Sequence, residues 1–236
     1  MEELYHELES TCYFDSLKQE KLRGLCHRMQ LYKYACNYTE SSIDQRLARK
    51  KQIEEVYWDS INTILIPLNP HLTGRATGCA LMIWRHIGLS QGDKEKLMTY
   101  ALDYARRLRQ NPCADFAKEE MDKLKKVLDD KQLKKAIDAK NEKDAHLRAA
   151  VLWEGIVKAH LNEGLDSVSQ VRMAYRYYSL ELYLQDYYVG QPELLKANLT
   201  DLYNHKPEII KMYEGIGTKA AIIKKREKEV GPEFAW

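Results

Sequence analysis

The chain has 236 residues, of which 44% are hydrophobic and 31% are charged, as is ordinary for a soluble globular protein. This length allows one large domain or two small ones. The formal net charge of +2 argues against a polyanion-binding surface over the whole molecule, although local basic segments remain open. Glycine and proline are sparse (11 and 6 residues) while Lys, Glu, Leu and Ala are abundant, so the composition favours helix over sheet.

The cysteines and the N-terminus bear on the cell compartment. The five cysteines are odd in number and form no CxxC pair, which argues against a disulfide framework and against a zinc site. The first residues, MEELYHELES, are acidic and lack the basic start and apolar core of a signal peptide. The longest apolar run, around residues 61–68, is too short to span a bilayer. We therefore expect a soluble cytoplasmic protein with no membrane segment.

The first part of the chain predicts successive amphipathic helices. Apolar residues at three-to-four spacing predict two short helices within residues 1–40. Ser42 followed by Gln45 has the form of a capping box, so a helix is expected to start there and to end at Pro67. An irregular stretch with two prolines and two glycines follows, and we interpret it as an interhelical loop.

Three more helical segments are expected before the middle of the chain. They are residues 79–87, a segment from Asp93 to residue 110, and a segment that restarts at Pro112. Arginines near residue 110 complement the helix dipole and require no functional explanation. The short stretch 138–144 is the best candidate for a hinge or domain boundary.

Residues 144–190 contain two consecutive segments that are apolar around most of their circumference. Because a helix that is apolar all round must be buried, we expect a central buried helical hairpin within an all-α bundle of about ten helices. The first helix is expected to direct one apolar face inward. That face comprises Leu147, Ala150, Val151, Val157 and Leu161.

Polar residues interrupt the hairpin in two places. In its first helix, Glu154 lies on the expected inward face, and His146, Trp153 and His160 recur at seven-residue spacing on the next face. A buried carboxylate beside a row of histidines can shift pKa values and support catalysis or ligation. The alternative is a structural ion pair between Glu154 and Lys158 in an all-α core.

In the second helix, a polar ladder runs between two apolar stripes. Such a ladder of arginine and tyrosine can stack bases and grip phosphates, or it can form a hydrated seam between helices. The candidate pocket residues are His146, Trp153, Glu154, His160, Arg172, Arg176 and Tyr183. No catalytic constellation is complete, and the single Glu-x-x-His pair, Glu3 with His6, does not support a di-metal site. We assign no catalytic residue, metal or cofactor.

A local motif lies near the C-terminus, in residues 207–231. Gly215-Ile216-Gly217 stands between an apolar helical segment and the lysine-rich stretch that begins at Lys219. This pattern resembles a helix-hairpin-helix motif, a resemblance that implies contact with a nucleic-acid backbone through a glycine turn and the next helix's N-terminus. The residues it implies are Gly215, Gly217, Lys219, Lys224 and Lys225. The alternative is a terminal helix pair with a glycine turn.

We expect a single helical domain over residues 1–236, with a possible division into 1–138 and 144–236. The favoured function is an interaction or adaptor protein with a protein partner, possible contact with nucleic acid and no membrane association. The alternative is a helical-bundle enzyme, or a metal-binding or cofactor-binding protein, with a pocket beside Glu154 and His160. A homo-oligomer built on exposed tyrosine faces is a third hypothesis, since the chain contains 16 tyrosines.

Overall fold

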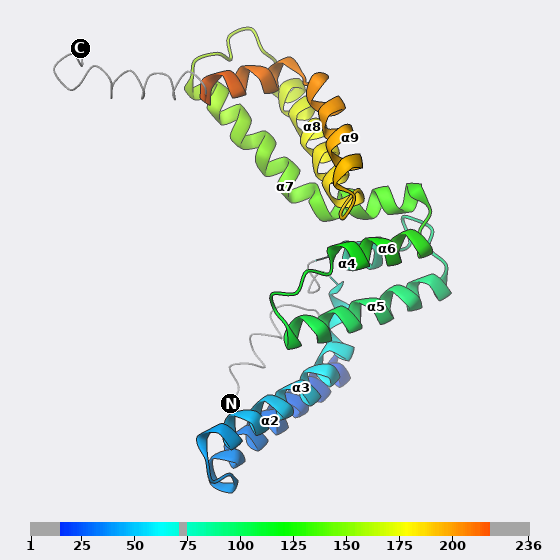
Figure 1. The fold of residues 1–236 in the computed structure, drawn as a ribbon, viewed down its shortest axis with the longest axis vertical. Helices are drawn as coiled ribbons and strands as arrows, with labels where there is room; N and C mark the ends of the chain where they lie inside the picture. Colours follow the sequence, from blue (N-terminus) through cyan, green and yellow to red (C-terminus); the bar gives the residue numbers. More distant parts are fainter. Residues whose placement is uncertain (1–14, 71–74, 218–236) are drawn as a thin grey trace, which may run out of the picture. The chain divides into compact units, whose positions relative to one another are not determined.

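The computed structural model describes residues 15–70 and 75–217. All regular elements in those residues are helices and none is a β-strand, which confirms the all-α prediction (Figure 1). The helices are α2 (Ser16–Thr39), α3 (Ile43–Leu68), α4 (Ala76–Met82), α5 (Gln91–Gln110), α6 (Ala117–Val127), α7 (Asp130–Lys158), α8 (Ser167–Tyr187) and α9 (Pro192–Asn204). Residues 208–217 are also helical. Within the same ranges, no helix has the length and apolar character needed to cross a membrane.

The chain divides into two compact units, residues 1–139 and 140–236. The division falls inside α7, which is one continuous helix through the segment 138–144 that the sequence offered as a hinge. Below, unit 1 and unit 2 denote the parts of these two ranges that the structure describes.

In unit 1, α2 and α3 form a helical hairpin with a short connection. The capping box expected at Ser42 is present, because the Ser42 hydroxyl accepts from the Gln45 amide and the Gln45 side chain accepts from the Ser42 amide. Apolar side chains from both helices form one buried cluster. Its members are Leu22, Leu25, Cys26, Met29, Ile61, Ile64 and Leu65. Pro67 lies one residue before the end of α3.

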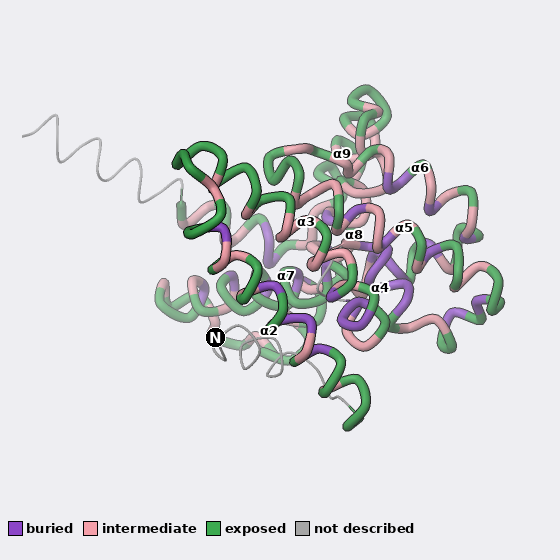
Figure 2. Tube along the Cα trace, turned by 90° about the horizontal axis from the view of Figure 1, so that it is seen from below, coloured by how far each residue is buried: buried purple, intermediate pink, exposed green. Residues whose placement is uncertain are grey.

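The remainder of unit 1 is built around α4, a single short helix that is buried from Ala76 to Leu81 (Figure 2). Helix α5 buries Leu97, Ala101 and Tyr104, and α6 buries Glu120, Met121 and Leu124. Glu120 is the unexpected member of this set, because a carboxylate is almost never buried without a partner. Its partners lie on and just before α4 and are described with the polar sites below.

In unit 2, the second half of α7 packs with α8 and with residues 208–217. The buried cluster comprises Ala149, Leu152, Ile156, Ala174, Tyr177, Ile209 and Ile210. This arrangement corrects the expected inward face of the first hairpin helix, because Leu147, Val151 and Val157 are 60%, 47% and 40% exposed. The packed face instead carries Ala149, Leu152 and Ile156, all fully buried.

The Tyr213 ring lies close to the α7 backbone at Gly155. A Cβ atom added there would lie 2.5 Å from Cε2 of Tyr213, so only glycine leaves room for this ring against α7.

Candidate functional site

An open groove of about 710 Å³ lies between α7 and the first turns of α8. Helix α7 contributes His146 and Trp153. Helix α8 contributes residues at the spacing of one helical face: Ser167, Val168, Val171, Arg172, Tyr175 and Arg176. All of these residues belong to unit 2, so the groove depends on no contact with unit 1.

The floor of the groove is apolar and aromatic. The Tyr175 ring stacks on the imidazole of His146, with 4.2 Å between ring centroids and 22° between their planes. Trp153, Val171 and Tyr175 pack from this side against the buried cluster of unit 2. Val168 is 65% exposed and therefore offers apolar surface to a ligand. Covering this surface would be favourable through the hydrophobic effect.

The charge at the groove is positive. Arg172 and Arg176 are both exposed, and neither forms an ion pair with any residue in 15–70 or 75–217. Asp166, which interacts electrostatically with Arg172, caps α8 by accepting a 2.9 Å hydrogen bond from the Ser169 amide. That hydrogen-bonding to Ser169 lowers the pKa of Asp166, and the charge of Arg172 adds a smaller contribution. Because neither arginine forms an ion pair within the described residues, both guanidinium groups are open to a ligand.

Four of the seven candidate pocket residues meet in this groove: His146, Trp153, Arg172 and Arg176. Glu154 does not, and the expectation that it lies on an inward face is wrong. Its side chain is 67% exposed and lies 3.7 Å from Lys158 on the surface of α7. The physical reason is the choice of packed face described above, since Glu154 shares the exposed face with Val151 and Val157.

His160 and Tyr183 also lie outside the groove lining. His160 adopts the left-handed conformation, with φ of 55°, at the C-terminal end of α7. Its amide donates to the Val157 carbonyl and the Leu161 amide donates to the Ile156 carbonyl, which together form a Schellman cap. Its exposed side chain thus sits at a helix terminus. Tyr183 stacks on Tyr187, with ring centroids 5.4 Å apart.

The C-terminal motif differs from the expected turn. Gly215 and Gly217 lie in the continuous helix of residues 208–217, and neither has a positive φ. No turn therefore occurs within Gly215–Gly217, where the described residues end. Glu214 accepts a 2.6 Å hydrogen bond from Lys206. Lys219, Lys224 and Lys225 lie outside the described residues.

The sequence did not single out Val168, Val171 and Tyr175 as binding residues. Their spacing predicts an apolar stripe, and a stripe can be core or groove floor. Arg172 and Arg176 alternate with this stripe, and a guanidinium without a carboxylate is costly to bury. Their positions could therefore have indicated that the stripe lies near the surface and forms the floor of a groove.

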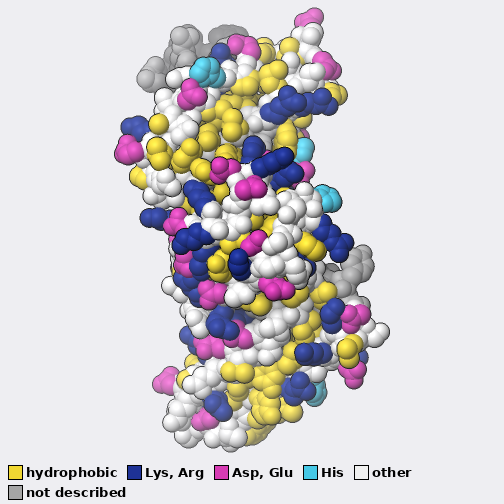
Figure 3. All heavy atoms as spheres, turned by 90° about the vertical axis from the view of Figure 1, so that its right-hand side faces the viewer, with side chains coloured by type: hydrophobic (Ala, Val, Ile, Leu, Met, Phe, Trp, Pro, Cys, Tyr) yellow, Lys and Arg dark blue, Asp and Glu magenta, His cyan; other side chains and the backbone are white. Residues whose placement is uncertain are grey.

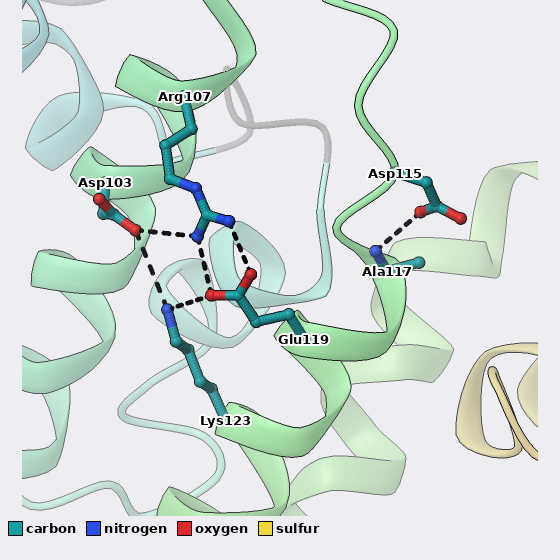
Figure 4. A network of polar contacts seen from close by, with 6 residues as sticks. All are labelled: Asp103, Arg107, Asp115, Ala117, Glu119 and Lys123. Carbon is teal, nitrogen blue, oxygen red and sulfur yellow. Dashed lines mark hydrogen bonds and ion pairs between the residues drawn. The ribbon is translucent and has the colours of Figure 1, made fainter. Parts of the chain in front are cut away.

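A second polar site lies in unit 1, where Arg107 of α5 meets a carboxylate of α6 (Figure 4). Arg107 donates to both oxygens of Glu119, at 2.8 and 2.7 Å, and Lys123 lies 2.8 Å from the same carboxylate. The hydrogen bond from Arg107, followed by that from Lys123, lowers the pKa of Glu119 to about 2. The guanidinium also lies 4.2 Å from the centre of the Phe116 ring. These charges already neutralise one another.

The next residue of α6, Glu120, is buried and makes a second set of polar contacts. Glu120 accepts hydrogen bonds from the Thr77 amide at 2.9 Å and from the Thr77 hydroxyl at 2.6 Å, and Arg75 donates to its other oxygen at 3.3 Å. The carboxylate thus caps the start of α4 and ties it to α6. In both contacts the carboxylate is already engaged by cationic groups of the chain, so each is interpreted as structural.

No set of three or more His, Cys, Asp or Glu side chains among the described residues is placed to hold a metal ion. Comparison with known proteins adds no identity: no family model matches this chain, and no curated protein or solved structure resembles it significantly.

Proposed function

We propose that this chain is a binding protein, and that the groove between α7 and α8 takes a helical segment of a partner protein. The segment would carry apolar side chains on one face and acidic side chains beside them. In this proposal the hairpin of residues 144–190 is the scaffold of the binding surface, and the protein acts in the cytoplasm.

The observation that carries the proposal is the pairing of two arginines without ion-pair partners in the described residues with an apolar floor. Exposed apolar surface at Val168 favours burial by a partner, and Arg172 and Arg176 favour acidic groups at the edge of that contact. Grooves of this kind accept amphipathic helices, whose anchor residues recur every three or four positions.

A nucleic acid fits the groove less well. One face of the Tyr175 ring is covered by His146, so that face is closed to a base. Two guanidinium groups would neutralise few phosphates, and a backbone-binding protein generally uses more. Binding of nucleic acid through Gly215, Gly217, Lys219, Lys224 and Lys225 remains a separate proposal, and the test below distinguishes it.

The test is a selection from a library of random peptides displayed on phage, with the full chain immobilised. The variant Arg172→Glu/Arg176→Glu serves for counter-selection. We expect enrichment of peptides with acidic residues and with apolar residues at helical spacing. For such a peptide, the double variant should weaken binding by at least about tenfold, because like charges would then meet at the rim. Enrichment of basic peptides, or of none, would overturn the proposal.

A matched control and a local readout complete the design. Lys158→Glu/Lys196→Glu makes the same change in charge at exposed positions outside the groove lining, and should leave binding unchanged. The indole N–H resonance of Trp153, assigned with Trp153→Phe, should shift on peptide addition. If instead a single-stranded oligonucleotide binds, and Lys224→Glu/Lys225→Glu abolishes that binding while Trp153 is unaffected, the nucleic-acid proposal replaces this one.

A further inference from the structure

One face of α3 in unit 1, centred on Gln52, is exposed to solvent, and its side chains are arranged symmetrically. The α2–α3 hairpin leaves large apolar side chains at its surface, among them Tyr32, which is 52% exposed, and Val56, which is 67% exposed. In the space-filling view of Figure 3, hydrophobic side chains gather in a patch at the lower end, with charged side chains at its edges, where Figure 1 draws this hairpin. An open groove of about 810 Å³ between α2 and α3 continues this surface.

The residues of this face are arranged symmetrically about Gln52. Arg49 and Glu55 lie three positions on either side of it, Ala48 and Val56 four, and Gln45 and Asp59 seven. The spacing of three, four and seven keeps all of these residues on one side of a helix. The two inner pairs are complementary: a cation with an anion, and a small residue with a larger apolar one. The outer pair is already used within the chain, since Asp59 pairs with Arg106 and Arg109 of α5 and Gln45 belongs to the capping box.

Arg49 and Glu55, which flank the centre of this face, differ from other charges of the hairpin. Other charges of the hairpin are engaged, since Lys33 pairs with Glu54 and Lys50 donates to Asn37 at 2.7 Å. Arg49 donates only to its neighbour Gln52, at 3.1 Å. Neither Arg49 nor Glu55 has an ion-pair partner among the residues that the structure places.

We infer that a second copy of this chain docks on this face, with the two α3 helices antiparallel and a two-fold axis at Gln52. A two-fold interface brings each surface patch against itself, so it requires self-complementarity. In the antiparallel arrangement Arg49 meets Glu55 of the other copy, and Ala48 makes room for Val56 of the other copy. A parallel arrangement would place Arg49 against Arg49, which is repulsive. The inference is independent of the groove in unit 2.

Charge reversal tests the pairing. We expect the full chain to form a dimer at micromolar concentrations in sedimentation velocity or multi-angle light scattering. Arg49→Glu and Glu55→Arg should each make the chain monomeric, since each places like charges across the axis. An equimolar mixture of these two variants should form a heterodimer, because both cross-axis pairs are then complementary. This recovery also shows that the single variants are folded.

Cross-linking tests the geometry. In a Cys113→Ser background, Gln52→Cys should form an intermolecular disulfide on oxidation, because two residues on the axis are adjacent where the helices cross. Gln45→Cys should not, since seven residues at 1.5 Å each on both chains separate the two thiols by about 20 Å. Cross-linking at both positions would indicate a parallel pair and would overturn the inference.

Two other outcomes would also overturn it. One is a chain that stays monomeric throughout the micromolar range. The other is a dimer that survives both single charge reversals, which would mean that copies meet through a different face, such as the exposed tyrosines Tyr34 and Tyr38 on α2.

Discussion

Two pairs of arginines, one pair in each unit, stand in opposite situations. In unit 1, Arg75 and Arg107 each contact a carboxylate from α6 and an aromatic ring. In unit 2, Arg172 and Arg176 line a groove with Trp153 and Tyr175 and have no ion-pair partner among the described residues. The same side-chain chemistry therefore holds helices together in the first pair and remains open at the surface in the second. A guanidinium indicates a binding site only when the fold leaves it without a carboxylate.

Both units combine ionic contacts with apolar packing. In unit 1, carboxylates of α6 pair with Arg75 and Arg107. In unit 2, Arg148 of α7 pairs with Glu181 of α8, beside the apolar packing of α7 against α8 and residues 208–217. Four predictions, from the largest expected effect to the smallest, sharpen the comparison.

The largest effect is expected at the buried carboxylate of unit 1. Glu120→Ala removes the acceptor of the Thr77 amide and leaves Arg75, only 16% exposed, without its partner. We expect the free energy of unfolding to fall by about 3–5 kcal/mol in urea titration. Glu120→Gln keeps an oxygen for Thr77 and should cost less. A loss below about 1 kcal/mol for the alanine variant would show that this contact is not structural.

The next effect tests steric packing in unit 2. Gly155→Ala should lower the free energy of unfolding by about 1–3 kcal/mol, because the new methyl group meets the Tyr213 ring. Gly24→Ala in α2 is the matched control. There the added Cβ meets nothing closer than the flexible Arg28 guanidinium at 3.6 Å, so helix propensity should stabilise the protein by up to about 1 kcal/mol. Equal effects at both glycines would refute the close approach at Gly155.

A smaller effect on the free energy of unfolding is expected when Glu119 is protonated at low pH. Its folded-state pKa of about 2 lies below its ordinary value of 4.5, so its contribution to stability is complete above pH 4.5 and is lost as the pH falls toward 2. Because the side chain is 39% exposed, screening should keep this contribution below about 1 kcal/mol.

Thermal unfolding between pH 5 and pH 2 measures this contribution. Glu119→Gln should flatten the loss of stability in that window, and high salt should weaken the wild-type effect. An unchanged slope in the variant would mean that other carboxylates account for it.

The smallest effect is expected at the open arginines. Arg172→Ala/Arg176→Ala should change the free energy of unfolding by no more than about 0.5 kcal/mol in urea, since neither side chain has an ion-pair partner within the described chain. A loss above about 1 kcal/mol would show that these arginines already serve the fold, and the contrast between the two units would fail.

Local signals predicted the helical class and several boundaries. The Ser42 cap was found from Ser-x-x-Gln alone, because a capping box is made by four consecutive residues. Continuous α7 was missed, since the charge-rich stretch 138–144 has the composition of a linker. Burial of Ala136, Ile137 and Ala145 keeps it helical, and burial depends on partners far away in the sequence.

The candidate site was predicted in part for a related reason. The seven-residue spacing places His146 and Trp153 on one face, and both line the groove. The same spacing also selected His160, which instead ends α7 in a left-handed conformation. The predicted position of Glu154 is wrong because the buried face of α7 carries Ala149, Leu152 and Ile156 and not Leu147, Val151 and Val157.

The continuity of α7 bears on how the molecule unfolds. This one helix contributes buried side chains on both sides of the division at residues 139 and 140, from Leu133 to Ile156. Helix formation propagates along a chain far more readily than it begins, so either half favours the other once formed. Loss of structure in one half of the polypeptide should therefore fray the other, and denaturation should approach a single cooperative transition.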